Sequence, residues 1–179
     1  LAKSFQSFDQ AAARASESQL IYFEMINRTR SSFVLWALGD FSEAYKADKD
    51  LLDEFNATLA DNRFGIDVIS SILYCSVGNY LININQIEEG LQKSIRGYDS
   101  SKKTTNALFT ATCTFLLARA YYLAGEYDKA ISLVEELDAI PYKQANKFLC
   151  ILSDSLKCKL YLLTNTEDKL KTLFEKNIN

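Results

Sequence analysis

The sequence predicts an all-α chain of stacked antiparallel helix pairs, and three observations lead to this prediction. Among 179 residues, Pro occurs once and Gly six times, which leaves few of the residues that punctuate many short strands. No stretch shows the sustained apolar–polar alternation that is typical of a half-buried strand. A pattern of small, apolar and turn-forming residues recurs four times along the chain. The length suits one domain, residues 1–179, with a sizeable core.

Each copy of the repeat is centred on a Gly or Asn, which we call the anchor: Gly39, Asn85, Gly125 and Asn165. Consecutive anchors lie 46, 40 and 40 residues apart. Seven positions before the anchors stand the small residues Ser32, Gly78, Ala118 and Cys158, and four positions before them stand Leu35, Leu81, Tyr121 and Tyr161. Nine positions after the anchors stand Asp48, Ser94, Val134 and Phe174. These later positions are less regular in the second and fourth copies.

The anchors predict the ends of helices, because Gly and Asn tolerate the left-handed conformation found there. The polar residue that follows an anchor suits the start of the next helix. The first helix of each pair is predicted over 19–38, 64–84, 106–124 and 143–163, and the second over 41–56, 86–98, 127–138 and 166–176. Polar or turn-rich loops are predicted over 56–62, 99–104 and 139–142.

The N-terminal stretch "FQSFDQAAARAS" allows two interpretations. Phe8 and Ala11 repeat the spacing of Tyr127 and Ala130, which favours a separate helix, the second one of a preceding pair. The alternative is that this stretch begins one long first helix. Because the chain starts with Leu rather than Met, we expect it to be part of a longer protein.

The segment "ARAYYLAGEYDKAISLVEEL", followed by Pro141, resembles a tetratricopeptide repeat in its order of small, aromatic, Gly, aromatic and Ala positions. The period of about 40 residues departs from the ~34 of that family. Longer first helices of this kind are similar to the MalT-like repeats of bacterial transcription regulators. The resemblance covers about residues 19–179 and implies a right-handed α-solenoid. It implies scaffolds, co-chaperones, peptide receptors and regulator sensor domains alike.

The composition offers little for catalysis or for cofactor binding. The chain has no His, which removes the commonest general base and metal ligand, and it has no Gly-rich phosphate loop. The four cysteines lack C-x-x-C spacing, so we expect buried, reduced thiols rather than zinc ligands or disulfides, as in a cytoplasmic protein. We expect no enzyme, no metal and no cofactor. A net charge of −3 disfavours nucleic acid as a partner, and no apolar run approaches the ~20 residues of a membrane helix.

We expect the function to lie in the concave groove that first helices line in a solenoid. Residues that follow or neighbour the small positions should point into it. The predicted groove residues are Phe33, Trp36, Asn79, Asn83, Phe115, Arg119, Tyr122 and Lys159. Asn side chains there would bond a peptide backbone, and the cations would meet a carboxylate. The alternative is that the aromatic residues are plain core.

The sequence leaves three roles open, of which the first two use this groove. The first is a module that binds a protein or peptide partner, and the second is a sensor domain that encloses a small ligand or peptide. The third is a scaffold that self-associates through its terminal repeats. The last predicted helix carries the apolar residues Leu170, Leu173, Phe174 and Ile178, which either further chain or a second copy would cover.

Overall fold

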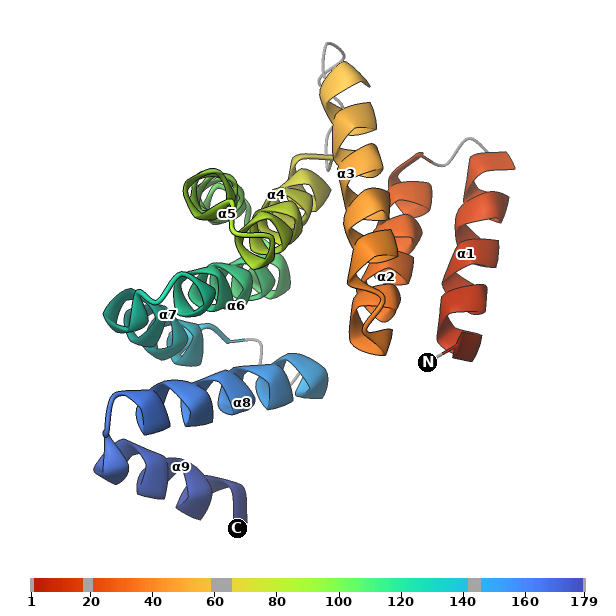
Figure 1. The fold of residues 1–179 in the computed structure, drawn as a ribbon. Helices are drawn as coiled ribbons and strands as arrows, with labels where there is room; N and C mark the ends of the chain where they lie inside the picture. The colour runs from red at the N-terminus through yellow and green to blue at the C-terminus, as the bar shows by residue number, and fades with distance from the viewer. Residues whose placement is uncertain (1, 18–20, 59–65, 142–145, 179) are drawn as a thin grey trace.

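The computed structural model describes residues 2–17, 21–58, 66–141 and 146–178, and over these ranges the chain is all-α, as predicted (Figure 1). The helices are α1 (Ala2–Glu17), α2 (Ile21–Leu38), α3 (Phe41–Thr58), α4 (Ile66–Asn83), α5 (Ile87–Lys102), α6 (Ala107–Leu123), α7 (Tyr127–Ala139), α8 (Lys147–Leu163) and α9 (Glu167–Ile178). No strand occurs in the described ranges. The stretch at the N-terminus forms a helix of its own, α1, which packs against α2.

Most predicted helix boundaries agree closely with the structure, although the predicted starts at 19, 64 and 143 lie outside the described residues. All three loop predictions were wrong at their first residues, because α3 continues to Thr58, α5 to Lys102 and α7 to Ala139. The polar residues at the end of α5 remain helical because Ser101 is buried there. Its carbonyl accepts a hydrogen bond from Thr110 Oγ1 of α6 at 3.2 Å.

The four anchors all end a helix with a left-handed residue. Their φ angles are 86° at Gly39, 68° at Asn85, 80° at Gly125 and 51° at Asn165. After each anchor, the next backbone N–H bonds to the carbonyl of the residue four positions before the anchor, at 3.0 Å (Asp40 to Leu35), 2.8 Å (Gln86 to Leu81), 2.9 Å (Glu126 to Tyr121) and 2.9 Å (Thr166 to Tyr161). This is the Schellman arrangement of a helix end. The repeat in the sequence therefore corresponds to a repeated turn in the structure.

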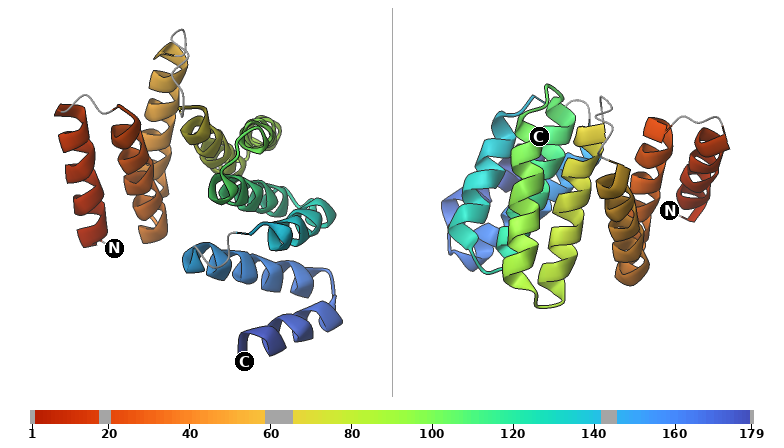
Figure 2. Two further views of the ribbon diagram at one scale, coloured as in Figure 1. Left: turned by 180° about the vertical axis from the view of Figure 1, so that it is seen from behind. Right: turned by 90° about the horizontal axis from the view of Figure 1, so that it is seen from above.

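The helices pack in chain order, each against the next, and further contacts join α2 to α4, α4 to α6, and α6 to α8. We call α2, α4, α6 and α8 the inner helices. In the ranges that the structure describes, α3, α5, α7 and α9 make no such contacts among themselves. They lie outside the inner helices, and the row of helices curves from α1 to α9 (Figure 1 and Figure 2).

The contact between α4 and α5 is very close because glycines meet small residues across it. A Cβ atom on Gly78 would lie 2.3 Å from Ser94 Oγ and 2.4 Å from the Gly90 carbonyl oxygen. A Cβ atom on Gly97 would lie 2.3 Å from the Ser71 carbonyl oxygen. All three distances are far below van der Waals contact, so these two helices approach at a separation that only glycine permits.

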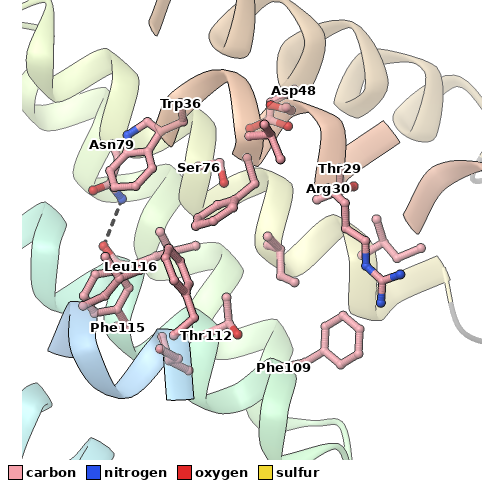
Figure 3. Close-up of a pocket in the computed structure, with 18 of the residues that line it drawn as sticks. Thr29, Arg30, Trp36, Asp48, Ser76, Asn79, Phe109, Thr112, Phe115 and Leu116 are labelled. Carbon is pink, nitrogen blue, oxygen red and sulfur yellow. Dashed lines mark hydrogen bonds between the residues drawn. The ribbon is translucent and has the colours of Figure 1, made fainter. Parts of the chain in front are cut away.

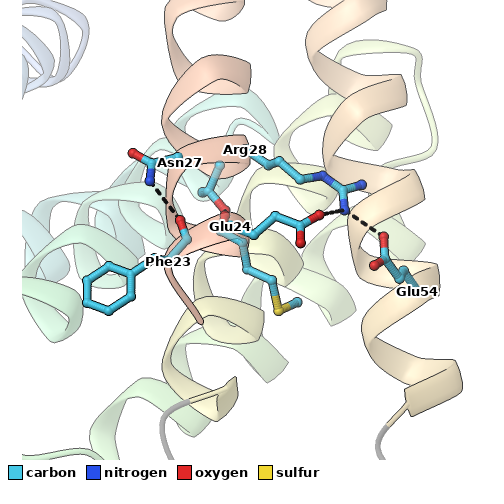
Figure 4. A network of polar contacts seen from close by, with 7 residues as sticks. Phe23, Glu24, Asn27, Arg28 and Glu54 are labelled. Atoms are coloured by element: carbon cyan, nitrogen blue, oxygen red, sulfur yellow. Dashed lines mark hydrogen bonds and ion pairs between the residues drawn. The ribbon is translucent and has the colours of Figure 1, made fainter. Parts of the chain in front are cut away.

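Apolar clusters on both sides of α4 fix the curve of the inner helices. One cluster joins α2, α3 and α4 and includes Leu51 and Leu73, while the other joins α4 to α8 and includes Val134 and Leu160. A polar network also links α2 to α3, where Arg28 Nη1 lies 2.7 Å from Glu54 Oε2 and 3.5 Å from Glu24 Oε1 (Figure 4). These contacts hold α2 in place opposite α6 and α8.

The cysteines are free thiols, as predicted. Cys75 and Cys113 are buried, and Cys150 and Cys158 are partly buried. Burial raises the pKa of the Cys75 thiol well above its ordinary value, and the adjacent Cys113 raises it further. Cys75 Sγ donates to the Ser94 carbonyl at 3.3 Å, so this thiol contributes to the α4–α5 contact.

Candidate functional site

A pocket of about 370 Å³ lies between the four inner helices, with Phe8 of α1 and Asp48 of α3 at its edge (Figure 3). We call it the inner pocket. Its walls are mainly apolar and carry the aromatic side chains Phe8, Phe33, Trp36, Tyr80, Phe109, Phe115 and Phe148. The volume falls in the range of about 300–1,000 Å³ that is usual for ligand sites.

The sequence forms this pocket because each inner helix turns one stripe of residues toward it. Side chains three or four positions apart share one face of a helix. The stripes run through Ile26, Thr29, Phe33 and Trp36 on α2, through Ile69, Ile72, Ser76, Asn79 and Tyr80 on α4, through Leu108, Thr112, Phe115 and Arg119 on α6, and through Phe148, Leu149 and Leu152 on α8. The pocket therefore depends on how these four helices are placed relative to one another.

Five of the eight predicted groove residues line the inner pocket. They are Phe33, Trp36, Asn79, Phe115 and Arg119. The other three, Asn83, Tyr122 and Lys159, lie outside its lining. These three stand nearer the C-terminal ends of α4, α6 and α8 than the turns that reach the pocket. That any of the eight binds a partner remains a prediction.

Asn79 joins α4 to α6 and orients Arg119. Its Nδ2 donates to the Cys75 carbonyl and to the Leu116 carbonyl, both at 2.9 Å, and its Oδ1 accepts from Arg119 Nη1 at 2.8 Å. Both amide hydrogens are therefore already donated within the protein. This differs from the expectation that Asn79 offers its amide to a peptide backbone, and it makes the residue a brace of the pocket wall.

Arg119 is held by the protein along two directions. Besides its bond to Asn79, its Cζ lies 5.1 Å from the centroid of the Trp36 ring, a cation–π contact between α6 and α2. Burial lowers the pKa of Arg119, and the nearby Tyr80 partly opposes that shift. The guanidinium remains a cation, because its ordinary pKa is far above neutral.

The mouth of the inner pocket is bounded by two exposed aromatic rings. Phe33 of α2 and Phe148 of α8 meet edge to face, with their ring centroids 5.5 Å apart. Phe33 and Phe148 come from the first and the last of the inner helices, and their ring contact joins α2 to α8. Such an aromatic pair contributes about 0.5–1.5 kcal/mol beyond its buried area, so this contact between α2 and α8 is weak.

The sequence prediction of groove residues missed Asp48, as it missed Arg30, Tyr80 and Phe148. Asp48 lies on α3 and is 4% exposed, and its Oδ1 has no hydrogen-bond partner in the protein. Burial raises the pKa of its carboxyl to about 7, although the adjacent Ser32 and Ser76 hydroxyls oppose the rise. The Ser32 hydroxyl donates instead to the Ala44 carbonyl, at 3.0 Å.

The repeat did contain a signal for Asp48. Nine positions after an anchor, Ser94 and Val134 are both fully buried, so this position faces the interior of a helix pair. An aspartate there is unusual, because a carboxylate is rarely buried unless it is paired. A charged residue at a position that the repeat assigns to the core is therefore a sign of a site.

The inner pocket is an apolar enclosure with two arginines and one buried carboxyl in its lining. Within the described residues, no group of three or more His, Cys, Asp or Glu side chains is placed to hold a metal ion. In the same part of the chain, no helix is long and apolar enough to cross a membrane. No family model matches the chain, and comparison with curated proteins and with solved structures gives no match either.

Proposed function

We propose that this chain is a non-catalytic recognition module that binds an apolar segment of a peptide or protein partner in the inner pocket. In this proposal the helices form a right-handed, tetratricopeptide-like solenoid, and the pocket lies on its concave side. The contacts that run from α2 to α4, α6 and α8 support this arrangement, and so does the turn repeated at the four anchors. The four free thiols favour a reducing compartment, and we place the module in the cytoplasm.

The observation that carries the proposal is the inner pocket itself. Five residues chosen from the repeat pattern converge on one apolar cavity of about 370 Å³. A cavity of this size accommodates one or two large side chains of a partner, and buried aromatic anchors of this kind carry much of the energy in protein interfaces. The exposed rings of Phe33 and Phe148 would contact the rest of such a segment.

A second candidate function is a sensor that encloses a small ligand, and the ring contact between Phe33 and Phe148 favours it. Because these residues come from opposite ends of the row of inner helices, a ligand beneath them would stabilise the curved arrangement. Binding would then raise the thermal stability of the chain, as expected for any ligand that prefers the folded state.

A pocket-filling variant tests the proposal. Peptides are selected by display against the chain, and their affinities are measured for the wild type and for Thr112→Phe. Thr112 lines the inner pocket, so the added ring occupies the cavity, and we expect a loss of affinity of about tenfold or more. Thr172→Phe on α9 is the matched control, because both hydroxyls donate to the carbonyl four residues earlier, at 2.8 Å and 2.9 Å.

Two outcomes would contradict the proposal. Peptides that bind Thr112→Phe as tightly as the wild type would place their site elsewhere on the chain. The second outcome is that the selection yields no peptide and that only small molecules raise the melting temperature of the chain. That result would favour the sensor over the peptide-binding module. Light scattering on the same samples shows whether a dimer of the chain blocks the pocket.

A further inference from the structure

The inner pocket contains a buried acid with an unused hydrogen-bonding atom. The carboxyl of Asp48 is 4% exposed, forms part of the pocket lining, and leaves Oδ1 without a hydrogen-bond partner. Figure 3 shows it beside Ser76, across the pocket from Phe115 and Leu116. A buried carboxylate without a partner is strongly unfavourable, so a donor that enters the pocket would recover much of that cost.

The groups around Asp48 supply no cation to it. Ser32 approaches it from α2 and Ser76 from α4, and Tyr80 of α4 is close enough for Asp48 to raise its pKa. On its own helix, Tyr45 packs its ring 5.5 Å from that of Tyr80. The surroundings on α3 and α4 are therefore hydroxyls and rings.

The two arginines in the lining of the inner pocket are held by other groups. Arg119 of α6 bonds to Asn79 and lies over Trp36. Arg30 of α2 has its Cζ 5.8 Å from the centroid of the Phe8 ring. Among the described residues, neither arginine forms an ion pair with Asp48.

We propose that the inner pocket binds an ammonium group carried on an apolar chain, with the ammonium donating to the carboxylate of Asp48 and the chain lying against the aromatic walls. This inference rests on the proposed function and names the chemistry of its ligand. An ammonium has three donors and no acceptor, and the neighbouring Ser76 and Tyr80 oxygens can accept the remaining hydrogens. The aromatic rings favour a cation over a neutral group of the same shape.

The protonation of Asp48 gives this binding a defined pH dependence. With a pKa of about 7, the carboxyl is largely protonated at pH 5.5 and largely ionised at pH 8. A bound ammonium favours the ionised form, so it must displace the proton below pH 7. As pH is raised toward 7, the affinity for an amine should therefore increase about tenfold per pH unit, and above pH 7 it should stay constant. A neutral ligand of the same shape should not follow this trend.

The experiment uses phenethylamine as the probe and phenethyl alcohol as its neutral counterpart. Trp36 is the only Trp in the chain and lines the inner pocket, so its fluorescence reports occupation directly. At pH 8 we expect the wild type to bind the amine about tenfold or more tightly than the alcohol, and Asp48→Asn to lose most of this preference. Asp53→Asn is the control, because it removes an exposed carboxyl of the same helix, where Asp53 Oδ2 lies 2.7 Å from Lys49 Nζ, and it should retain the preference.

The outcomes separate the failure of this inference from the failure of the proposed function. Equal affinities of the wild type for the amine and the alcohol would overturn the inference and leave the pocket as an apolar binding site. Absence of binding by both probes would overturn the inference, whereas the peptide selection with Thr112→Phe decides the proposed function separately. If Asp48→Asn does not fold, the wild-type protein still tests the inference through its pH dependence. A preference for the amine over the alcohol that is the same at pH 5.5 and pH 8 would contradict a role for Asp48.

A second pair of probes identifies the source of the ammonium. The acetylated tripeptide amide Leu-Lys-Leu is compared with the same peptide acetylated on its lysine. A lysine-dependent affinity that exceeds that of phenethylamine supports the inference with a partner polypeptide as the source. Binding of phenethylamine without binding of either peptide supports it with a small free amine as the source.

Discussion

Lys157 and Asp48 are both buried ionisable residues, but Lys157 has charged partners within the protein and Asp48 has none among the described residues. Lys157, at the contact between α7 and α8, is 2% exposed, and its Nζ lies 2.6 Å from Asp138 Oδ1 and 3.5 Å from Asp154 Oδ1. Asp48, in the inner pocket, is 4% exposed and keeps Oδ1 without a partner. The desolvation cost of a buried charge is offset when its partners are present, whereas a buried charge without a partner marks a place where a ligand can supply one.

The largest expected effect comes from breaking the paired charge. Lys157→Ala leaves a cavity where the buried stem of the side chain packed and removes the cation of two partly exposed carboxylates, so we expect a loss of about 4 kcal/mol in the free energy of unfolding, most of it from the cavity. Urea unfolding monitored by circular dichroism measures it. Lys169→Ala is the matched control, because Lys169 Nζ lies 2.6 Å from Glu135 Oε1 on the exposed surface. Lys169→Ala should have the same free energy of unfolding as the wild type. Equal losses in Lys157→Ala and Lys169→Ala would show that the burial of Lys157 makes no difference.

The second effect concerns the unpaired charge and its dependence on pH. The pKa of the Asp48 carboxyl is about 7 in the folded chain and its ordinary value of 3.8 in the unfolded chain. Between these pH values the unfolded chain releases a proton that the folded chain keeps, so stability falls as pH rises through this window. From pH 5 to pH 8 the loss should be about 3 kcal/mol.

Asp48→Asn should abolish that loss and so be most stabilising, relative to the wild type, at pH 8. Unfolding curves of both proteins at pH 5 and pH 8 provide the measurement. If the two proteins respond identically to pH, then Asp48 does not ionise near neutrality and the contrast with Lys157 fails.

A third buried polar residue sharpens the comparison because it is neutral and fully bonded. Asn79→Leu removes three hydrogen bonds and leaves the Leu116 carbonyl and Arg119 without their partner, which should cost about 2 kcal/mol. Asn83→Leu is the control, since exposed Asn83 makes one bond, from Nδ2 to the Asn79 carbonyl at 3.1 Å. We expect a change within about 0.5 kcal/mol there. Similar losses in both variants would show that Asn79 is no brace.

The fold was largely predictable because its punctuation is local. A Gly or Asn that adopts a positive φ ends a helix wherever it stands, so Gly39 and Asn165 could be identified without knowledge of tertiary contacts. The end of α5 could not be predicted in this way. The residues after Tyr98 are polar and resemble a loop, and they remain helical because Ser101 packs against α6.

The candidate site was predictable only where helical spacing determines it. Trp36 and Phe115 follow from the stripe that each first helix presents, and both line the inner pocket. Asp48 lies on a second helix, where the groove pattern does not extend. Tyr122 and Lys159 lie beyond the inner pocket, because the curvature of the row of helices determines how far the pocket extends. This curvature depends on side-chain packing between repeats, which the pattern within one repeat does not predict.

The pKa of the Asp48 carboxyl, measured by carbon NMR of the side chain as pH is varied, tests the central claim most directly. A midpoint near 7 in the free protein, falling by one unit or more when phenethylamine is added, would match a buried acid that awaits a cation. A midpoint near 4 that the amine does not change would mean that the carboxyl is already solvated or paired, and would contradict the account.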